Sequence, residues 1–199
     1  MKRFARGQTL FIEGDRSARV FMIERGSAIV FCTVPAGRDV VLAVRGPGDV
    51  LGDLSALDDG PRFATAVALD EVEAVVAPPS SLVRSLDDVD AVKDLVQTLV
   101  DRLREADRRR LEFATRDTLG RVATRLLELA GRFGVSTPEG TVVDLPISQD
   151  QLASWCAASR ESTVKALGTL RGLGCIATSR RRFVVLDSEA LSRYAGDSS

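Results

Sequence analysis

The chain has 199 residues, a formal net charge of −1, 45% hydrophobic residues and no histidine. This length and composition predict an ordinary soluble protein with one large or two small domains. The absence of histidine excludes histidine-based catalytic triads, imidazole acid–base catalysis and histidine ligation of zinc or haem.

Other enzyme and metal signals are missing as well. The three cysteines, Cys32, Cys156 and Cys175, are far apart, which argues against a disulfide framework, a metal site or an iron–sulfur cluster. There is no Walker loop, no G-x-S-x-G motif and no nucleophile–base pair, so an enzyme is disfavoured and no metal or cofactor is expected. No apolar run is long enough to span a membrane. Residues 1–7 are basic but lack the apolar stretch of a signal peptide, so the predicted location is cytoplasmic.

The first half of the chain has the pattern of a β-rich domain. From Thr9 to about Ala77, short apolar runs such as Val20–Ile23 and Val40–Val44 are separated by glycines. Many short strands with turn residues between them predict an antiparallel barrel or sandwich. The segment from Gly52 to Arg62 interrupts this pattern with a helical turn and a tight loop. Glycine, free N–H groups and an arginine together suit a phosphate, and an ordinary structural turn is the alternative.

A long helix is predicted after the β-rich domain. Apolar residues recur at helical spacing from Val89 to Arg116, which indicates an amphipathic helix of roughly 28 residues, or about 40 Å. Such a helix is too long for one small domain to cover, and a second copy of itself is the simplest partner for its apolar face. The residues expected at this dimer interface are Leu95, Leu99, Leu103 and Ala106. A second helix is expected over Asp117–Phe133.

Two short helices joined by a tight turn are predicted between Ile147 and Leu167. Ser148 and Ser159 are suitable N-caps, because a serine oxygen accepts a hydrogen bond from an N–H group of the first turn. Gln151 follows Ser148 at the spacing of a capping box. The sequence therefore predicts a helix-turn-helix.

The second of these helices and the segment after it carry the residues expected to bind DNA. Apolar runs on either side of a turn with three arginines predict a β-hairpin, or wing. Arg160 and Lys165 are candidates to read guanine, and Glu161 is a candidate acceptor for cytosine or simply a favourable charge at a helix start. The remaining candidates are expected to hold phosphates: Ser148, Ser159, Arg180, Arg181 and Arg182.

An antiparallel β-roll, a long helix and a C-terminal winged helix-turn-helix, in that order, resemble the CRP/FNR family of bacterial transcription regulators. The resemblance covers nearly the whole chain. The segments that match family motifs are Phe21–Ser27, Gly46–Leu54, Pro61–Ala66, Gly120–Ala123 and Ser159–Glu161. Met1 lies closer to the first expected strand than in many members, so the family's short N-terminal extension is expected to be missing or trimmed.

The resemblance also implies an effector pocket, and this chain departs from its pattern. Cyclic-AMP-binding members bind the ribose through a Gly-Glu-Leu glutamate, the phosphate through an Arg-Ser pair and the adenine through a Thr-Ser pair. The matching positions here are Gly52, Asp53, Leu54, Arg62, Phe63, Ala106 and Asp107. Asp53 is one methylene shorter, Phe63 is bulky and cannot donate, and the adenine hydroxyls are missing. Each lost hydrogen bond costs about 1 kcal/mol or more.

The prediction from the sequence is therefore an α+β protein. It has an N-terminal antiparallel, jelly-roll-like β-roll over residues 1–88, a dimerisation helix over 89–116 and a winged helix-turn-helix over 117–199. The predicted function is that of a homodimer that binds a palindromic double-stranded DNA site and does not respond to cyclic AMP in the usual way. RNA polymerase is a further candidate partner.

Several alternatives stay open at this point. One is ordinary cyclic AMP sensing, and another is a different small effector in a modified pocket. A third is a ligand-free regulator held permanently in its DNA-binding form. A nucleotide in the pocket, or a pocket filled by Phe63, would decide most of what is open among these three. The last is a sensor module that acts through protein contacts rather than through DNA.

Overall fold

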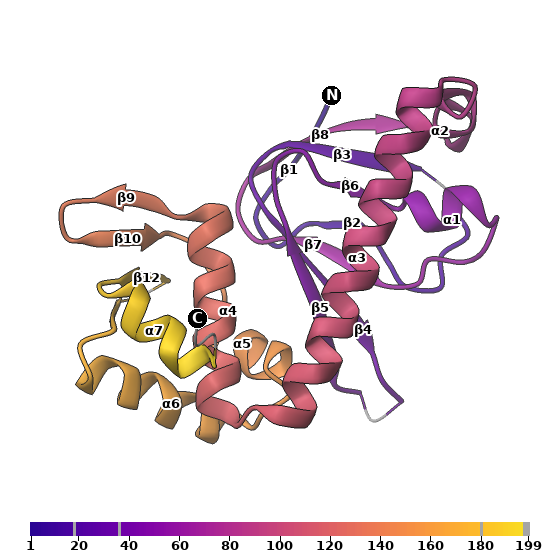
Figure 1. The fold of residues 1–199 in the computed structure, drawn as a ribbon. Helices are drawn as coiled ribbons and strands as arrows, with labels where there is room; N and C mark the ends of the chain where they lie inside the picture. The colour runs from indigo at the N-terminus through magenta and orange to yellow at the C-terminus, as the bar shows by residue number, and fades with distance from the viewer. Residues whose placement is uncertain (18, 36, 180, 197–199) are drawn as a thin grey trace. The chain divides into compact units, whose positions relative to one another are not determined.

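The computed structural model describes residues 1–17, 19–35, 37–179 and 181–196. The chain divides into two compact units, Met1–Arg110 and Leu111–Ser199, and each is described by itself (Figure 1). No helix in the described part of the chain is long and apolar enough to cross a membrane.

The first unit contains two four-stranded antiparallel sheets. In one sheet the order is β1 (Lys2–Phe4), β8 (Val72–Ala77), β3 (Val20–Arg25) and β6 (Val50–Leu51). In the other the order is β2 (Thr9–Phe11), β7 (Thr65–Ala68), β4 (Ala28–Thr33) and β5 (Asp39–Arg45). The glycine-separated apolar runs predict antiparallel strands here, and the resemblance to the CRP/FNR family predicts this β-roll.

The two sheets of the β-roll share one hydrophobic core. Phe4 and Phe21 come from the first sheet and Phe11 from the second, and all three are buried. The ring of Phe21 lies 6.0 Å from that of Phe4 and 5.7 Å from that of Phe11, measured between centroids. Aromatic pairs at such distances add to the stabilisation from burial.

Among residues 1–17, 19–35 and 37–115, three helices accompany the β-roll. They are α1 (Asp53–Leu57), α2 (Pro79–Ser85) and α3 (Val89–Thr115). The long helix α3 agrees within one residue with the predicted range, and it crosses the division between the two units. None of its residues is buried, although apolar side chains recur along it. This apolar face, which is not buried within the protomer, is the surface that we expect a second copy of the chain to cover.

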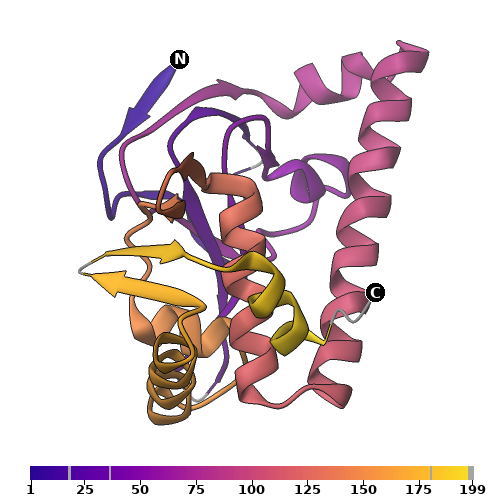
Figure 2. The same cartoon turned by 60° about the vertical axis from the view of Figure 1, so that its left-hand side comes forward.

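The described residues of the second unit form four helices and a four-stranded antiparallel sheet. The helices are α4 (Thr118–Phe133), α5 (Gln149–Trp155), α6 (Arg160–Gly172) and α7 (Ser188–Ala195). The sheet order is β11 (Ile176–Ser179), β12 (Arg182–Val185), β10 (Gly140–Val143) and β9 (Val135–Thr137). In two views, the hairpin β11–β12 and α6 lie on the same side of α4 (Figures 1 and 2).

The predicted hairpin is present, but it is part of a larger sheet. The sequence analysis did not identify β9 and β10. Strand β10 pairs with β12, with Thr141 opposite Val185, so the hairpin is fixed along one edge. The buried core of this unit draws Val122 and Leu126 from α4, Leu170 from α6 and Ile176 from β11.

Candidate functional site

The first helix of the helix-turn-helix, α5, begins at the predicted cap. The Ser148 hydroxyl oxygen accepts a hydrogen bond from the Gln151 N–H at 3.1 Å. The Ser148 N–H in turn donates to the Gln151 side-chain oxygen at 2.8 Å. This capping box satisfies two backbone donors at once, and it fixes where α5 starts relative to the loop before it.

The turn between α5 and α6 contains a strained residue that the sequence analysis did not identify. Ala157 has a φ of 46°, in the left-handed region that side chains with a Cβ rarely adopt. It is exposed. The turn then leads directly into Ser159, whose hydroxyl oxygen caps α6 by accepting from the Ser162 N–H at 3.1 Å. The sharp turn sets the crossing of the two helices.

Helix α6 has one buried face and one exposed polar face. Thr163, Ala166, Leu167 and Leu170 are buried. Arg160, Glu161 and Lys165 are exposed near the start of the helix, as are Ser162 and Val164. Side chains near the start of a recognition helix are the ones that reach base edges in the major groove. The structure therefore brings these three predicted residues together on an accessible surface.

Arg160 has a partner that sequence reasoning missed. Its guanidinium lies 3.6 Å from the carboxylate of Asp150 on α5, and both side chains are about two-thirds exposed. An exposed ion pair of this kind contributes little to stability. Arg160 is therefore oriented across the two helices and remains available to another acceptor.

The hairpin β11–β12 carries exposed cations at its end. Ser179 pairs with Arg182 across the two strands, and Arg181 lies in the turn with a φ of 66°. Both arginines are exposed. Arg180, the third predicted wing arginine, lies outside the described residues. The tight turn places at least two guanidinium groups beside α6 in one structural unit.

A buried charge cluster lies in the core of the same unit. Arg125 of α4 is only 3% exposed, and it forms ion pairs with Glu112 and Glu128. Its guanidinium also lies 5.5 Å from the ring of Trp155, measured to the centroid. A buried charge is tolerated only when it is paired in this way, so the end of α3, the helix α4 and the helix α5 are joined by one network.

The cysteine at the end of α5 is packed against this cluster. Burial raises the pKa of the Cys156 thiol to about 12, even though the nearby Arg125 opposes that shift. The thiol is therefore neutral at ordinary pH. Cys156 is fully buried in the hydrophobic core, in the manner of a small apolar residue.

The predicted effector residues of the β-roll are engaged with one another. Arg62 is only 2% exposed. It donates from Nη1 to the Gly52 carbonyl oxygen at 2.9 Å and to the Ser55 hydroxyl at 2.7 Å, and from Nη2 to the Arg19 carbonyl oxygen. Its guanidinium also lies 4.5 Å from the centroid of the Phe11 ring.

Gly52 is required by this arrangement. Its φ is 78°, and a Cβ at this position would lie 2.2 Å from Nη1 of Arg62. Any side chain here would displace the buried guanidinium. The glycine therefore allows the backbone to approach the Arg62 guanidinium closely. The sequence pattern of this loop had suggested a close approach to a phosphate instead.

Asp53 is also paired within the chain. It is buried, and both carboxylate oxygens accept from Nη1 of Arg102, at 2.7 and 3.0 Å. Arg102 lies on α3 and donates as well to the Val50 carbonyl oxygen. The sequence analysis did not identify Arg102, because the contact joins positions 49 residues apart.

The remaining expected pocket residues point to solvent. Phe63 is 67% exposed, so its side chain does not fill the pocket. Leu54 is exposed as well. Ala106 and Asp107 are both exposed on α3, and Asp107 pairs with Arg110 at 2.9 Å. The two positions at which the resemblance implies contacts to adenine are therefore Ala106, which has no polar side chain, and Asp107, whose carboxylate is paired with Arg110.

The expected interface residues lie on α3 with differing exposure. Leu95 and Leu99 are half-buried within the protomer, whereas Leu103 is 61% exposed and Ala106 is exposed. Val96 and Leu111 are also exposed apolar side chains of the same helix region. Such a row of free apolar groups is typical of a surface that meets a partner.

The two halves together define a class of protein: a β-roll of the type that binds cyclic nucleotides, followed by a winged helix-turn-helix. Residues 1–88 match the family model of the cyclic nucleotide-binding domain, and residues 120–194 match that of the Crp-like helix-turn-helix domain. The chain belongs to the CRP/FNR family of transcription regulators.

Individual relatives agree with this assignment. The chain is 34% identical to the CRP-like cAMP-activated global transcriptional regulator of Mycobacterium tuberculosis, over 96% of this chain and 86% of that protein. It is 31% identical to the transcriptional regulator LdrP of Thermus thermophilus, over 98% and 97%. Its fold is similar to the crystal structure of TTHB099, a CRP-family regulator from Thermus thermophilus, with a TM-score of 0.84, 31% identity and coverage of 100% and 98%.

Proposed function

We propose that this DNA-binding transcription regulator acts as a homodimer that reads a palindromic site, and that it does so without cyclic AMP. The observation that carries the DNA-reading part is the exposed polar start of α6. Arg160, Glu161 and Lys165 stand there beside the cationic hairpin, while the opposite face of the helix is buried. This arrangement suits insertion of α6 into the major groove with the hairpin on the phosphates.

The homodimer is supported by the free apolar face of α3. A two-fold axis along this helix would repeat the recognition helix, and a dimer of this kind binds half-sites about 34 Å apart. Arg160 and Lys165 are then the proposed guanine contacts and Glu161 the proposed cytosine contact. Ser148, Ser159, Arg181 and Arg182 are the proposed phosphate contacts, as is Arg180, of which the structure gives no description.

The experiment for DNA reading is selection of duplexes from a random pool by the purified full-length protein. We expect the selected sequences to share two inverted half-sites spaced by one helical turn. Affinity for the selected site should fall steeply with salt, because phosphate contacts release counterions. Recovery of no enriched sequence at low salt would contradict the proposal and favour the sensor that acts through protein contacts.

Independence from cyclic AMP is supported by the internal pairing of the pocket. A phosphate would have to draw Arg62 away from three acceptors of its own chain. A ribose hydroxyl would have to compete with Arg102 for Asp53. An effector shifts a conformational equilibrium only if it binds one of the two states more tightly than the other. Because Arg62 and Asp53 already have partners within the chain, we expect cyclic AMP to gain little binding free energy from them in either state.

A nucleotide-responsive regulator is the second candidate, favoured by the similarity to a relative described as cAMP-activated. Calorimetry with cyclic AMP, together with DNA titrations with and without it, separates the two. We expect a dissociation constant above roughly 100 μM and unchanged DNA affinity. Micromolar binding together with a gain in DNA affinity would establish the second candidate.

A further inference from the structure

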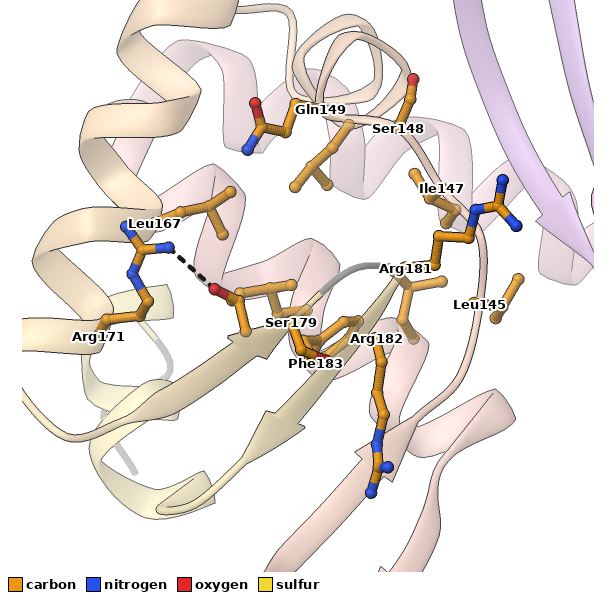
Figure 3. A pocket seen from close by; sticks show the side chains of 14 residues that line it. Leu145, Ile147, Ser148, Gln149, Leu167, Arg171, Ser179, Arg181, Arg182 and Phe183 are labelled. Atoms are coloured by element: carbon orange, nitrogen blue, oxygen red, sulfur yellow. Dashed lines mark hydrogen bonds between the residues drawn. The ribbon is translucent and has the colours of Figure 1, made fainter.

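The C-terminal unit contains a cavity of 320 Å³ among α4, α5, α6 and the hairpin β11–β12 (Figure 3). Half of the residues that line it are apolar. Leu126, Leu152 and Leu167 reach it from the three helices, and Ile147 and Phe183 line it from the loop and the hairpin. Cavities that hold small ligands have volumes of about 300–1,000 Å³. This one is therefore large enough for a small molecule with an apolar body.

The polar residues that line the cavity are arginines, serines, a threonine and the amide Gln149. Three arginines line it, and no aspartate or glutamate is among the lining residues. This local excess stands out in a chain with 27 basic and 28 acidic residues. Within the described part of the chain, Arg171, Arg181 and Arg182 form no ion pair. The cavity is therefore suited to an anion.

One of these arginines is already held in a useful position. Arg171 donates from Nη1 to the Thr178 hydroxyl oxygen at 2.9 Å, which leaves the hydroxyl hydrogen available to an acceptor. Figure 3 shows the Arg171 and Arg181 guanidinium groups on opposite sides of the cavity, with Leu167 beside Arg171. The Arg182 side chain leads away from the cavity.

We propose that this cavity binds a small amphipathic anion, namely an aliphatic monocarboxylate. The aliphatic chain contacts the apolar lining residues, and the carboxylate accepts from Arg171 and Thr178. An arginine fork and a hydroxyl match the two oxygens of a carboxylate, and such charge-assisted hydrogen bonds are strong.

A consequence for regulation rests on the proposed DNA function. Ser148 and Arg181, which are proposed phosphate contacts, also line the cavity. A bound anion adds a negative charge there and reduces the attraction for the phosphate backbone. The carboxylate and DNA should therefore weaken each other's binding by the same factor.

The first arm of the test is calorimetry on the full-length protein without DNA. The probes are butyrate, hexanoate and octanoate, with octylammonium as a control of equal length and opposite charge. We expect octanoate to bind about fifteenfold more tightly than hexanoate, because it has two more methylenes and each buried methylene strengthens binding by about fourfold. No binding of octanoate, equal binding of the three carboxylates or equal binding of octylammonium would overturn the proposal.

Two matched variants separate the ligand site from the DNA surface. Arg171→Gln should weaken octanoate by about tenfold or more, since a charge-assisted bond is lost, and should leave DNA affinity unchanged. Lys165→Gln should weaken DNA binding and leave octanoate binding unchanged, because Lys165 is an exposed residue of α6 that does not line the cavity. Circular dichroism establishes that both variants fold, and Thr178→Val serves as a second ligand-site variant. Unaltered octanoate binding in both Arg171→Gln and Thr178→Val would overturn the site.

The second arm measures DNA affinity in the presence of octanoate. We expect a saturable, several-fold loss of affinity in the wild type that disappears in Arg171→Gln. An equal loss in Arg171→Gln would overturn the regulatory link. If calorimetry detects octanoate while DNA binding fails, only the proposed DNA function fails. If DNA binding is intact and calorimetry is silent, only the ligand site fails.

Discussion

Arg102 on the long helix and Asp53 at the start of α1 form a buried ion pair in which one guanidinium nitrogen binds both carboxylate oxygens, at 2.7 and 3.0 Å. Asp53 occupies the position at which nucleotide-binding relatives are expected to bind the ribose. Here the long helix supplies the partner from within the chain. Together with the three neutral acceptors around Arg62, the pair engages both charged side chains of the pocket from within the chain, while the buried Nε of Arg62 has no hydrogen-bond partner among the described residues.

Arg102→Leu should lower the free energy of unfolding by roughly 2–4 kcal/mol, because it leaves the Asp53 charge buried and unpaired. The double variant Asp53→Asn, Arg102→Leu should recover part of this loss, since the charge is removed with its partner. Urea unfolding measures both. As a control, Arg104→Leu breaks an exposed pair with Asp101 and should change stability by less than about 1 kcal/mol. Equal effects of the two single variants would contradict the buried pair.

Arg160→Ala should cost about 1–3 kcal/mol on the selected DNA site and relax the preference at one base pair, because it removes a base contact. Arg181→Ala should instead weaken all sequences alike and reduce the salt slope by about one unit. Binding titrations against single-base variants of the site measure both effects. If Arg160→Ala weakens every sequence uniformly, then α6 is not the reading helix.

Leu103→Glu should convert the dimer to a monomer and abolish binding to the palindrome. Leu103 is mostly exposed within the protomer, so the variant should keep its fold, whereas an unpaired charge at a buried dimer seam costs several kcal/mol. Leu99→Glu should have the same effect on assembly. Sedimentation measures the oligomeric state, and the exposed Gln97 provides the control Gln97→Glu. A dimeric Leu103→Glu protein would place the interface elsewhere.

Ala157→Gly should stabilise the protein by about 0.5–1 kcal/mol, because glycine adopts a positive φ without the steric cost that alanine has there. The neighbouring Ala158 is half-buried against the core, and Ala158→Gly should destabilise by a similar amount. Thermal unfolding of the two variants should therefore shift in opposite directions. Shifts of the same sign would show that the strain at Ala157 contributes nothing.

The buried thiol of Cys156 should make stability fall at alkaline pH. Its pKa is raised by burial from 9.0 to about 12, so the unfolded chain loses this proton at a lower pH than the folded one. The stabilising contribution is complete below about pH 9 and is lost progressively up to about pH 12. Cys156→Ala should reduce this alkaline loss, measured by urea unfolding at several pH values. An unchanged pH profile in the variant would contradict the assignment.

Local signals in the sequence determined much of the architecture. The caps at Ser148 and Ser159, the apolar spacing along residues 89–115 and the glycine-separated apolar runs act over a few residues. They could therefore be interpreted without knowing the fold. The same holds for the exposed polar start of α6, because helical periodicity alone separates Arg160 and Lys165 from the buried Leu167.

Only the tertiary structure decided which charges pair. Asp53 and Arg102, like Arg125 and Glu112, are far apart in the sequence and meet because packing brings their elements together. Likewise, β10 was recognisable as a strand only once its partner β12 lay beside it. The exposure of Phe63 and the cationic cavity beneath the hairpin also depend on several elements at once, and no short-range pattern encodes such an arrangement.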